Sequence, residues 1–228
     1  MVNSKTKDTA QQKLPPWLRA FVKPADLAEI AAAIKHVEIS TSGEVVPMVV
    51  SRSMVTGHVL PMVFLMLGLF YVTVEALFDE GALHGAHIAW FFVELGGLAL
   101  LALILSRLDW VKRLMTSDAD MGVQVLRRAE TEFYKAGLHR TKDGTGVLIF
   151  VSVAERRAVV LADQGIAQHL QPDTWSNVVS VITGSVKDGG LGQGFVEAIS
   201  RCGALLAQHF PVKDHDRNEL HDALVILD

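Results

Sequence analysis

The sequence predicts an α/β protein, with a small mixed β-sheet flanked by helices and split by an inserted pair of transmembrane helices. Three observations lead to this fold class. A strand-like run, "SGEVVPMVV" (42–50), precedes two long apolar stretches, and further strand and helix patterns follow them. Half of the 228 residues are hydrophobic, and the mean hydropathy is +0.31. Because a lone strand cannot satisfy its own backbone hydrogen bonds, the first strand needs partners beyond the apolar stretches.

Composition and charge exclude some classes of function. The formal net charge of −4 gives no reason to expect nucleic-acid binding, and basic residues do not cluster with aromatic ones. The single cysteine, Cys202, cannot form an internal disulfide, which suits a reducing compartment, and it lies on an apolar helical face typical of core packing. Residues 1–23 are polar, lack the apolar core of a signal peptide and are expected to form a flexible leader.

The first part of the predicted domain covers residues 24–56. Pro24 opens a helix, and its apolar positions recur at helical spacing: Leu27, Ile30, Ile34 and Val37. The strand at 44–50 follows. Pro47 lies within this strand and removes one donor of the hydrogen-bond ladder, so the strand is expected to be bulged there or to have a free edge.

Residues 57–106 are predicted to form a transmembrane helical hairpin. The apolar runs 58–78 and 84–106 are each long enough to cross a bilayer, which takes about 20 residues. The alternative is a pair of buried helices in a soluble core. The short link "DEGAL" leaves room only for a tight turn.

The flanking charges predict how this hairpin is oriented. Basic residues stand on both sides of it, whereas the link carries two acids and no Lys or Arg: Arg52, Arg107, Lys112 and Arg113 against Asp79 and Glu80. Because basic residues beside membrane spans stay on the cytoplasmic side, both termini are predicted to be cytoplasmic. The predicted location is therefore the plasma or inner membrane, with two spans.

Four residues within the two runs form a predicted intramembrane polar stripe: Glu75, His84, His87 and Glu94. Tyr71 is expected to be the nearest polar group to Glu94 on the neighbouring helix. One interpretation is a proton- or metal-sensitive site with the two histidines as ligands. The other is that these groups hydrogen-bond two helices, or two copies of the protein, helped by close approach at Gly96 and Gly97.

The second part of the domain is predicted at residues 107–211, followed by a C-terminal tail at 212–228. Ser117 can cap a helix that stops near Gly137. Two strands, 146–153 and 158–162, are joined by the polar turn "AERR" and form a hairpin. Helices follow at about 173–186 and 191–209.

Three stretches together resemble the TPM domain family: "TSGEVVPMVV", "GVLIFVSVAERRAVVLADQGI" and "GLGQGFVEAISRCGALLAQHFP". The resemblance covers residues 24–56 and 107–211, and it implies a small mixed sheet with helices on both faces. Some members of the family are acid phosphatases and some bind calcium.

The resemblance also implies a ligand set for calcium or another divalent cation: Asp163, Asp173 and Asp188. Ala167 stands where relatives often carry an acid, so this set is depleted. The alternative is that the three aspartates are loop residues and helix caps.

Two functions of different classes follow. The first is a membrane-anchored, non-catalytic binding or adaptor module that contacts the lipid bilayer and a protein partner or forms a homo-oligomer. The second is a metal-assisted phosphatase on the same scaffold. The sequence favours the first and names no partner, ligand or pathway.

Overall fold

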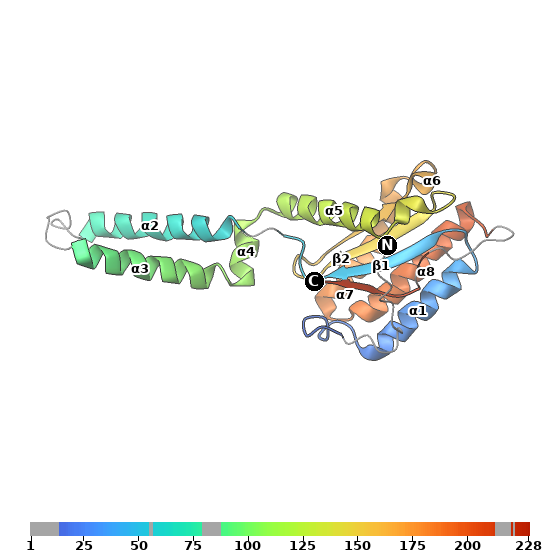
Figure 1. Ribbon diagram of the computed structural model, residues 1–228, viewed down its shortest axis with the longest axis horizontal. Helices are drawn as coiled ribbons and strands as arrows, with labels where there is room; N and C mark the ends of the chain where they lie inside the picture. Colours follow the sequence, from blue (N-terminus) through green and yellow to red (C-terminus); the bar gives the residue numbers. More distant parts are fainter. Residues whose placement is uncertain (1–13, 55–56, 79–87, 213–219, 221) are drawn as a thin grey trace, which may run out of the picture. The chain divides into compact units, whose positions relative to one another are not determined.

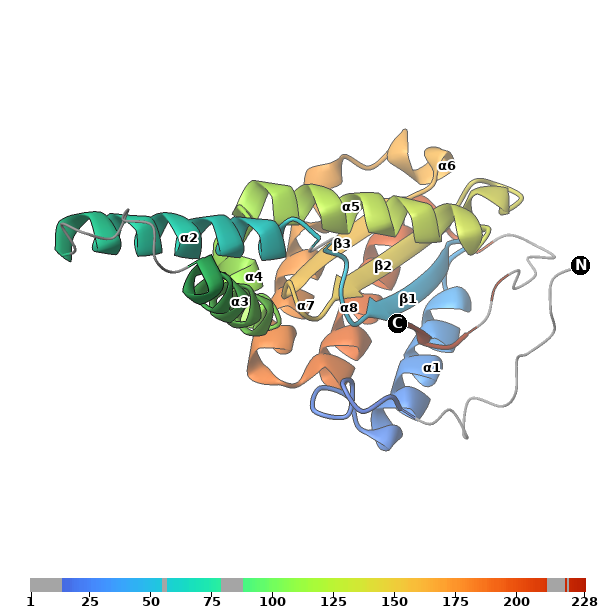
Figure 2. The ribbon, with the colours of Figure 1, turned by 60° about the vertical axis from the view of Figure 1, so that its left-hand side comes forward.

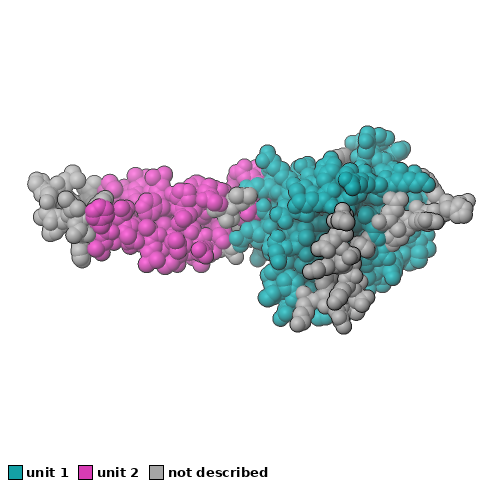
Figure 3. All heavy atoms as spheres, in the orientation of Figure 1, with its two compact units in different colours: residues 1–53, 122–228 teal, residues 54–121 magenta. Residues whose placement is uncertain are grey.

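The computed structural model describes residues 14–54, 57–78, 88–212, 220 and 222–228. Residues 1–13 of the predicted flexible leader therefore lie outside the described residues, whereas Leu14, Leu18 and Val22 in its second part are buried in the core of unit 1 and are not a flexible leader. The chain divides into two compact units (Figure 3). Unit 1 comprises residues 1–53 and 122–228, and unit 2 comprises residues 54–121.

Unit 1 is built on a four-stranded mixed sheet with strand order β3-β2-β1-β4 (Figure 1). β1 (Glu44–Val50) runs parallel to β2 (Gly146–Ser152), residue for residue from Glu44 opposite Gly146. β2 pairs antiparallel with β3 (Arg157–Ala162), and β1 pairs parallel with β4 (Val225–Leu227). The predicted pairing of the first strand with a partner beyond the apolar stretches is confirmed, as is the hairpin of β2 and β3.

Helices cover both faces of this sheet (Figure 2). One face packs against α1 (Pro24–Glu38), α7 (Ser176–Asp188) and α8 (Leu191–His209). The other packs against α5 (Asp118–Lys135) through Val125, Ala129 and Phe133. Because both faces are covered, every residue of β1 and β2 is buried, which explains their nearly uninterrupted apolar sequences.

Small residues let α8 approach its two neighbours closely. A Cβ atom added at Gly203 would collide with Val37 of α1, and one added at Gly194 would collide with Ser185 of α7. The glycine-rich sequence of α8 therefore serves helix packing. The short elements are α4 (Asp109–Met115), η2 (Leu138–Arg140), α6 (Gln164–Ala167) and η3 (Pro172–Trp175).

Unit 2 contains the helical hairpin, α2 (Val59–Phe78) and α3 (Ile88–Leu105), which lie side by side (Figure 1). The helical prediction is correct, but the prediction that they are transmembrane is wrong. Among the residues that the structure describes, no helix combines the length and the apolar character needed to cross a membrane.

The second predicted span is longer than the helix that the structure describes there. Hydropathy extended it over residues 84–106, whereas α3 begins only at Ile88 and is 18 residues long, about 27 Å at 1.5 Å per residue. Residues 79–87 lie outside the described part of the chain. The lipid partner, the membrane location and the cytoplasmic termini were inferred from the spans, and these predictions are corrected with them.

Two further details concern the edge of the sheet. β1 is not bulged at Pro47, which stands in register opposite Ile149. β4 pairs with β1 from Met48 onward, one residue past the proline. Sequence analysis did not identify β4, because this three-residue strand lies within the segment assigned as a tail.

The β1–β2 pairing predicts the behaviour of a fragment. Residues 107–228 alone should aggregate and show no cooperative unfolding, because β2 loses its parallel neighbour and exposes an edge. Size-exclusion chromatography and denaturant unfolding would measure this. Co-expression of residues 1–56 as a separate chain should restore a soluble complex. A fragment that folds cooperatively on its own would contradict the prediction.

Candidate functional site

The three aspartates that the family resemblance implies as metal ligands occupy separate places in unit 1. Asp163 is the N-cap of α6, where its carboxylate accepts a hydrogen bond from the backbone N–H of Gln164 at 2.7 Å. Asp173 lies in η3 before α7, and Asp188 is the exposed last residue of α7. The 13 residues of α7 span about 20 Å, so Asp173 and Asp188 lie far apart.

Within the described ranges, no group of three or more His, Cys, Asp or Glu residues is arranged to hold a metal ion. The contact of Asp163 with Gln164 is a helix-capping interaction, the alternative role considered for these aspartates. Their assignment as ligands for calcium or another divalent cation stays a prediction.

The structure brings together three other carboxyl groups, those of Glu38, Glu44 and Asp222. Glu38 ends α1, Glu44 begins β1, and Asp222 precedes β4 by three residues. The pKa of Glu38 is raised to about 8, chiefly by burial and then by the negative charges of Asp222 and Glu44. A side-chain hydrogen bond with Asp222 acts in the same direction, and the charge of Lys35 opposes it.

This carboxyl cluster (Glu38, Glu44 and Asp222) can hold and release a proton near neutral pH. Two carboxyl groups that share a hydrogen bond need one proton between them, so protonated Glu38 is the form that fits this geometry. Strongly shifted pKa values mark candidate functional groups, although structural clusters shift them too. Sequence analysis missed the cluster because Asp222 is far from Glu38 and Glu44 in the chain and joins them only when β1 and β4 pair.

A second buried polar group lies at the carboxyl end of β1 and β2. Ser152 and Glu155 are both buried, and the Ser152 hydroxyl donates to the Glu155 carboxylate. Ser53 donates its hydroxyl to Ser152 Oγ at 2.8 Å and its backbone N–H to Glu155 at 3.2 Å. These bonds fasten the chain leaving β1 to the turn after β2. Their role is therefore to close the sheet at the point where unit 2 is inserted.

The predicted polar stripe is described only in part. His84 and His87 lie outside the described residues, and Glu75 is placed in α2 without a described side chain. The Tyr71 hydroxyl donates to the Glu94 carboxylate at 2.5 Å, so the expected contact between the two helices is confirmed. This hydrogen bond joins α2 and α3, and the functional role of the polar stripe stays a prediction.

Gly96 and Gly97 do not bring α2 and α3 together. A Cβ atom added at either glycine would meet nothing within 4 Å, so both face open space within one copy of the chain. Of the two expectations for these glycines, close approach inside the hairpin is therefore not seen. Close approach between two copies stays a prediction.

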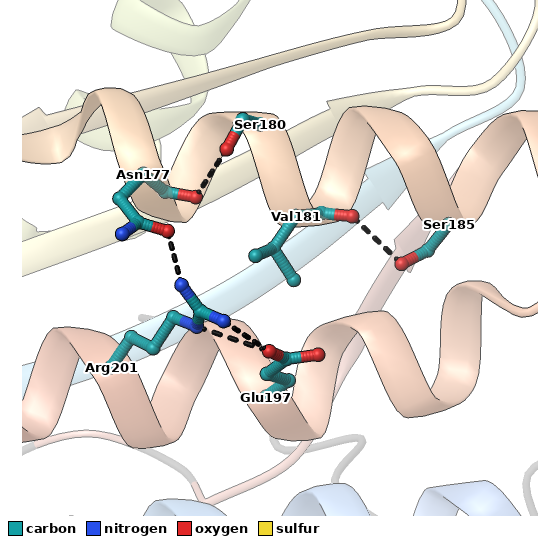
Figure 4. A network of polar contacts seen from close by, with 6 residues as sticks. All are labelled: Asn177, Ser180, Val181, Ser185, Glu197 and Arg201. Atoms are coloured by element: carbon teal, nitrogen blue, oxygen red, sulfur yellow. Dashed lines mark hydrogen bonds and ion pairs between the residues drawn. The ribbon is translucent and has the colours of Figure 1, made fainter.

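The exposed ridge between α7 and α8 carries a polar network (Figure 4). Arg201 donates to the carboxylate of Glu197 one helical turn away, with its Nε at 3.1 Å, and to the side-chain oxygen of Asn177 on α7. These hydrogen bonds are exposed, so the network ties two helices together and contributes little to stability.

Cys202 is fully buried in α8, as predicted, and burial raises its pKa to about 12. A thiol with this pKa stays protonated at neutral pH, whereas the thiolate is the reactive form. Core packing is therefore its role.

The carboxyl cluster predicts an unusual pH dependence of stability. Because the folded pKa of Glu38 is raised from 4.5 to about 8, its stabilising contribution is complete below the unfolded value and is lost as pH rises through about 8. Glu38→Gln should remove this loss. The free energy of unfolding of the variant, measured relative to wild type at the same pH, should therefore be higher near pH 9 than near pH 5. The expected difference is roughly 1–2 kcal/mol, reduced because the carboxyl group is half exposed.

Urea unfolding of wild type and Glu38→Gln across this pH range measures the effect. Glu130→Gln, at an exposed position on α5, controls for the loss of one formal charge. Parallel pH profiles for wild type and Glu38→Gln would contradict the raised pKa.

Comparisons with known proteins agree with this fold. The solution NMR structure of the BA42 protein from the psychrophilic bacterium Bizionia argentinensis matches with a TM-score of 0.55 and 22% sequence identity. The match covers 91% of this chain and 96% of that chain, and at this identity it establishes the fold alone. No curated protein matches the chain. Residues 110–205 match the family described as "TPM domain", within the second of the two segments in which sequence analysis found the resemblance, so the chain carries a TPM domain at these residues.

Proposed function

We propose that this chain is a non-catalytic binding module, in which the TPM domain protein presents the α2–α3 hairpin to a protein partner. The single observation that carries the proposal is the exposed apolar surface of this hairpin. Fifteen large hydrophobic side chains on the described parts of α2 and α3 are between 37% and 72% exposed. Contiguous apolar patches of this extent mark interaction sites on proteins.

The hairpin core is too small to account for these residues. Val59, Val63 and Ala102 are buried where α2 meets α3, and Val111 of α4 joins them. This small cluster closes one seam between the helices. Phe64, Leu67 and Leu105 pack partly buried against this cluster, whereas the fifteen exposed side chains stay accessible after the hairpin has folded.

The insertion point supports the same function. Unit 2 is inserted between β1 and α5 of unit 1, and the bonds of Ser53 with Ser152 and Glu155 fix the chain at its exit from β1. Within the hairpin, the hydrogen bond from Tyr71 to Glu94 already joins the two helices, so the binding element is preorganised before it meets its partner.

The binding function predicts which surface matters. The double variant Leu65→Glu with Leu100→Lys should reduce partner binding at least about tenfold, because charges replace two of the most exposed apolar side chains of the hairpin. The measurement is the amount of protein, including copies of this chain, that saturably binds the tagged full-length chain in a detergent-free extract.

A matched control places the same two charges on unit 1. Val123→Glu with Val212→Lys changes two exposed apolar residues outside the hairpin and also leaves the net charge unchanged. This variant should bind as wild type does. Equal binding by wild type and both double variants would exclude the hairpin as the binding surface.

The same proposal predicts weak phosphatase chemistry. Purified protein should hydrolyse phosphomonoesters more slowly than about 1 s⁻¹, near the low end of typical enzyme rates, because the length of α7 separates Asp173 in η3 from Asp188. Steady-state assays with added calcium or magnesium would measure this. Faster turnover that Asp173→Asn abolishes and Asp26→Asn leaves unchanged would favour a metal-assisted phosphatase instead.

A further inference from the structure

We propose that the segment carrying β4 (residues 222–228) is a pH-sensitive latch on the sheet, which covers the edge of β1 in a closed form and detaches as a unit in an open form. The latch belongs to unit 1 and is independent of the binding function proposed for the hairpin. Three features of the fold support it: a short edge strand, a hydrogen bond at each end of the segment, and a carboxyl cluster with one member on the segment.

β4 is the strand of this sheet that detaches most easily. β2 aligns with β1 along the whole length of both strands, whereas β4 aligns only with residues 48–50 of β1 (Figure 2). All residues of β1 and β2 are buried, but those of β4 are half-buried. Local opening needs the least free energy where the hydrogen-bond ladder is short and the side chains are partly exposed. β4 is therefore expected to open before the rest of the sheet.

A side-chain hydrogen bond holds each end of the segment. At one end, Asp222 is hydrogen-bonded to Glu38, the last residue of α1. At the other end, the carboxylate of Asp228 accepts the indole N–H of Trp17 at 3.2 Å. Between them, Leu224 is buried in the core of unit 1. Because the indole N–H neither gains nor loses a proton near neutral pH, the bond of Asp222 is the one that responds when the pH rises.

The carboxyl cluster couples this bond to pH. A hydrogen bond between two carboxyl groups needs a proton, and Glu38 holds it because burial, followed by the charges of Asp222 and Glu44, raises its pKa to about 8. The charged groups that act on Glu38 come from the segment (Asp222), from β1 (Glu44) and from α1 itself (Lys35), and only the charge of Lys35 opposes the shift. When Glu38 loses its proton, the hydrogen bond is replaced by repulsion between carboxylates.

This repulsion acts on the segment, because the other two carboxyl groups are held in place. Glu44 lies within the β1–β2 pairing, and Glu38 belongs to α1, whose apolar face is buried in the core. Asp222 lies in a bend before β4. Movement of Asp222 therefore relieves the repulsion with the smallest loss of packing. It uncovers the backbone edge of β1 at residues 48–50, and such an edge can pair with an added strand.

The test is hydrogen–deuterium exchange of the full-length chain, with protection factors corrected for the pH dependence of intrinsic exchange. The amides of β4 should be at least about tenfold less protected than those of β2, because the latch opens without global unfolding. Dilute urea should accelerate exchange in β2 and leave exchange in β4 unchanged, because a short segment exposes little surface when it detaches.

The pH dependence is measured on the same amides. Because the pKa of Glu38 is raised from 4.5 to about 8 in the closed form, its stabilising contribution is complete below the lower value and is lost as the pH rises through about 8. The protection of β4 should therefore be at least about tenfold lower near pH 9 than near pH 6.

Asp222→Asn tests the sensor. The amide donates a hydrogen bond to ionised Glu38 and removes the negative charge of the segment, so the protection of β4 should change by less than about threefold over the same pH range. Glu130→Gln, at an exposed position on α5, controls for the loss of one formal charge and should behave as wild type does. Trp17→Phe should lower the protection of β4 at both pH values and preserve its pH dependence, because it removes only the bond to Asp228.

Three outcomes would overturn the inference. Equal protection of β4 and β2 would show that the segment opens only when the whole domain unfolds. Equal protection of β4 near pH 6 and near pH 9 would show that the carboxyl cluster does not control opening. The same pH dependence in wild type and Asp222→Asn would place the sensor elsewhere. The first two outcomes are decided on wild type alone, so they hold even where the variant does not fold.

Discussion

The parallel pairing of β1 with β2 is the interaction on which the rest of this structure depends. Glu44 to Val50 align with Gly146 to Ser152, although about a hundred residues separate the two strands in sequence. Both strands are buried along their whole length, and each buried valine contributes about 1.5–3 kcal/mol relative to exposure. The order of the other strands follows, because β3 pairs only with β2 and β4 only with β1.

The pairings of β1 with β2 and with β4 also create the polar features of unit 1. At the carboxyl end of the strands, Ser53 meets Ser152 and Glu155. At the other end, the start of β1 brings Glu44 beside Glu38, and the approach to β4 adds Asp222. Burial and mutual repulsion then raise the pKa of Glu38 into the physiological range. The β1–β2 register therefore determines the hydrogen bonds of Ser53, and the β1–β4 register completes the carboxyl cluster.

Unit 2 obeys a different constraint. Two helices can bury only one seam between them, and here that seam contains Val59, Val63 and Ala102 together with the hydrogen bond from Tyr71 to Glu94. The outward apolar faces have no counterpart among the described residues of the same unit. Their composition gives the hairpin its high hydropathy, which sequence analysis interpreted as membrane spans. The same composition suits contact with another protein surface, so hydropathy alone does not identify what covers a helix.

The sequence by itself determined the local elements of the chain. Residue periodicity and end signals, which act over a few residues, predict the start of α1, the bounds of α8, the capping of α5 by Ser117, the β2–β3 hairpin and the burial of Cys202. The need of the first strand for distant partners was also predictable, because backbone hydrogen bonds must be satisfied.

Only the tertiary structure decided which distant residues meet. Glu38, Glu44 and Asp222 carry no shared motif, and β4 is too short to produce a sequence pattern. The separation of Asp173 from Asp188 depends on the course of α7, and the open surroundings of Gly96 and Gly97 depend on which face of α3 contacts α2. These features arise from register and helix rotation, which short-range sequence preferences do not specify.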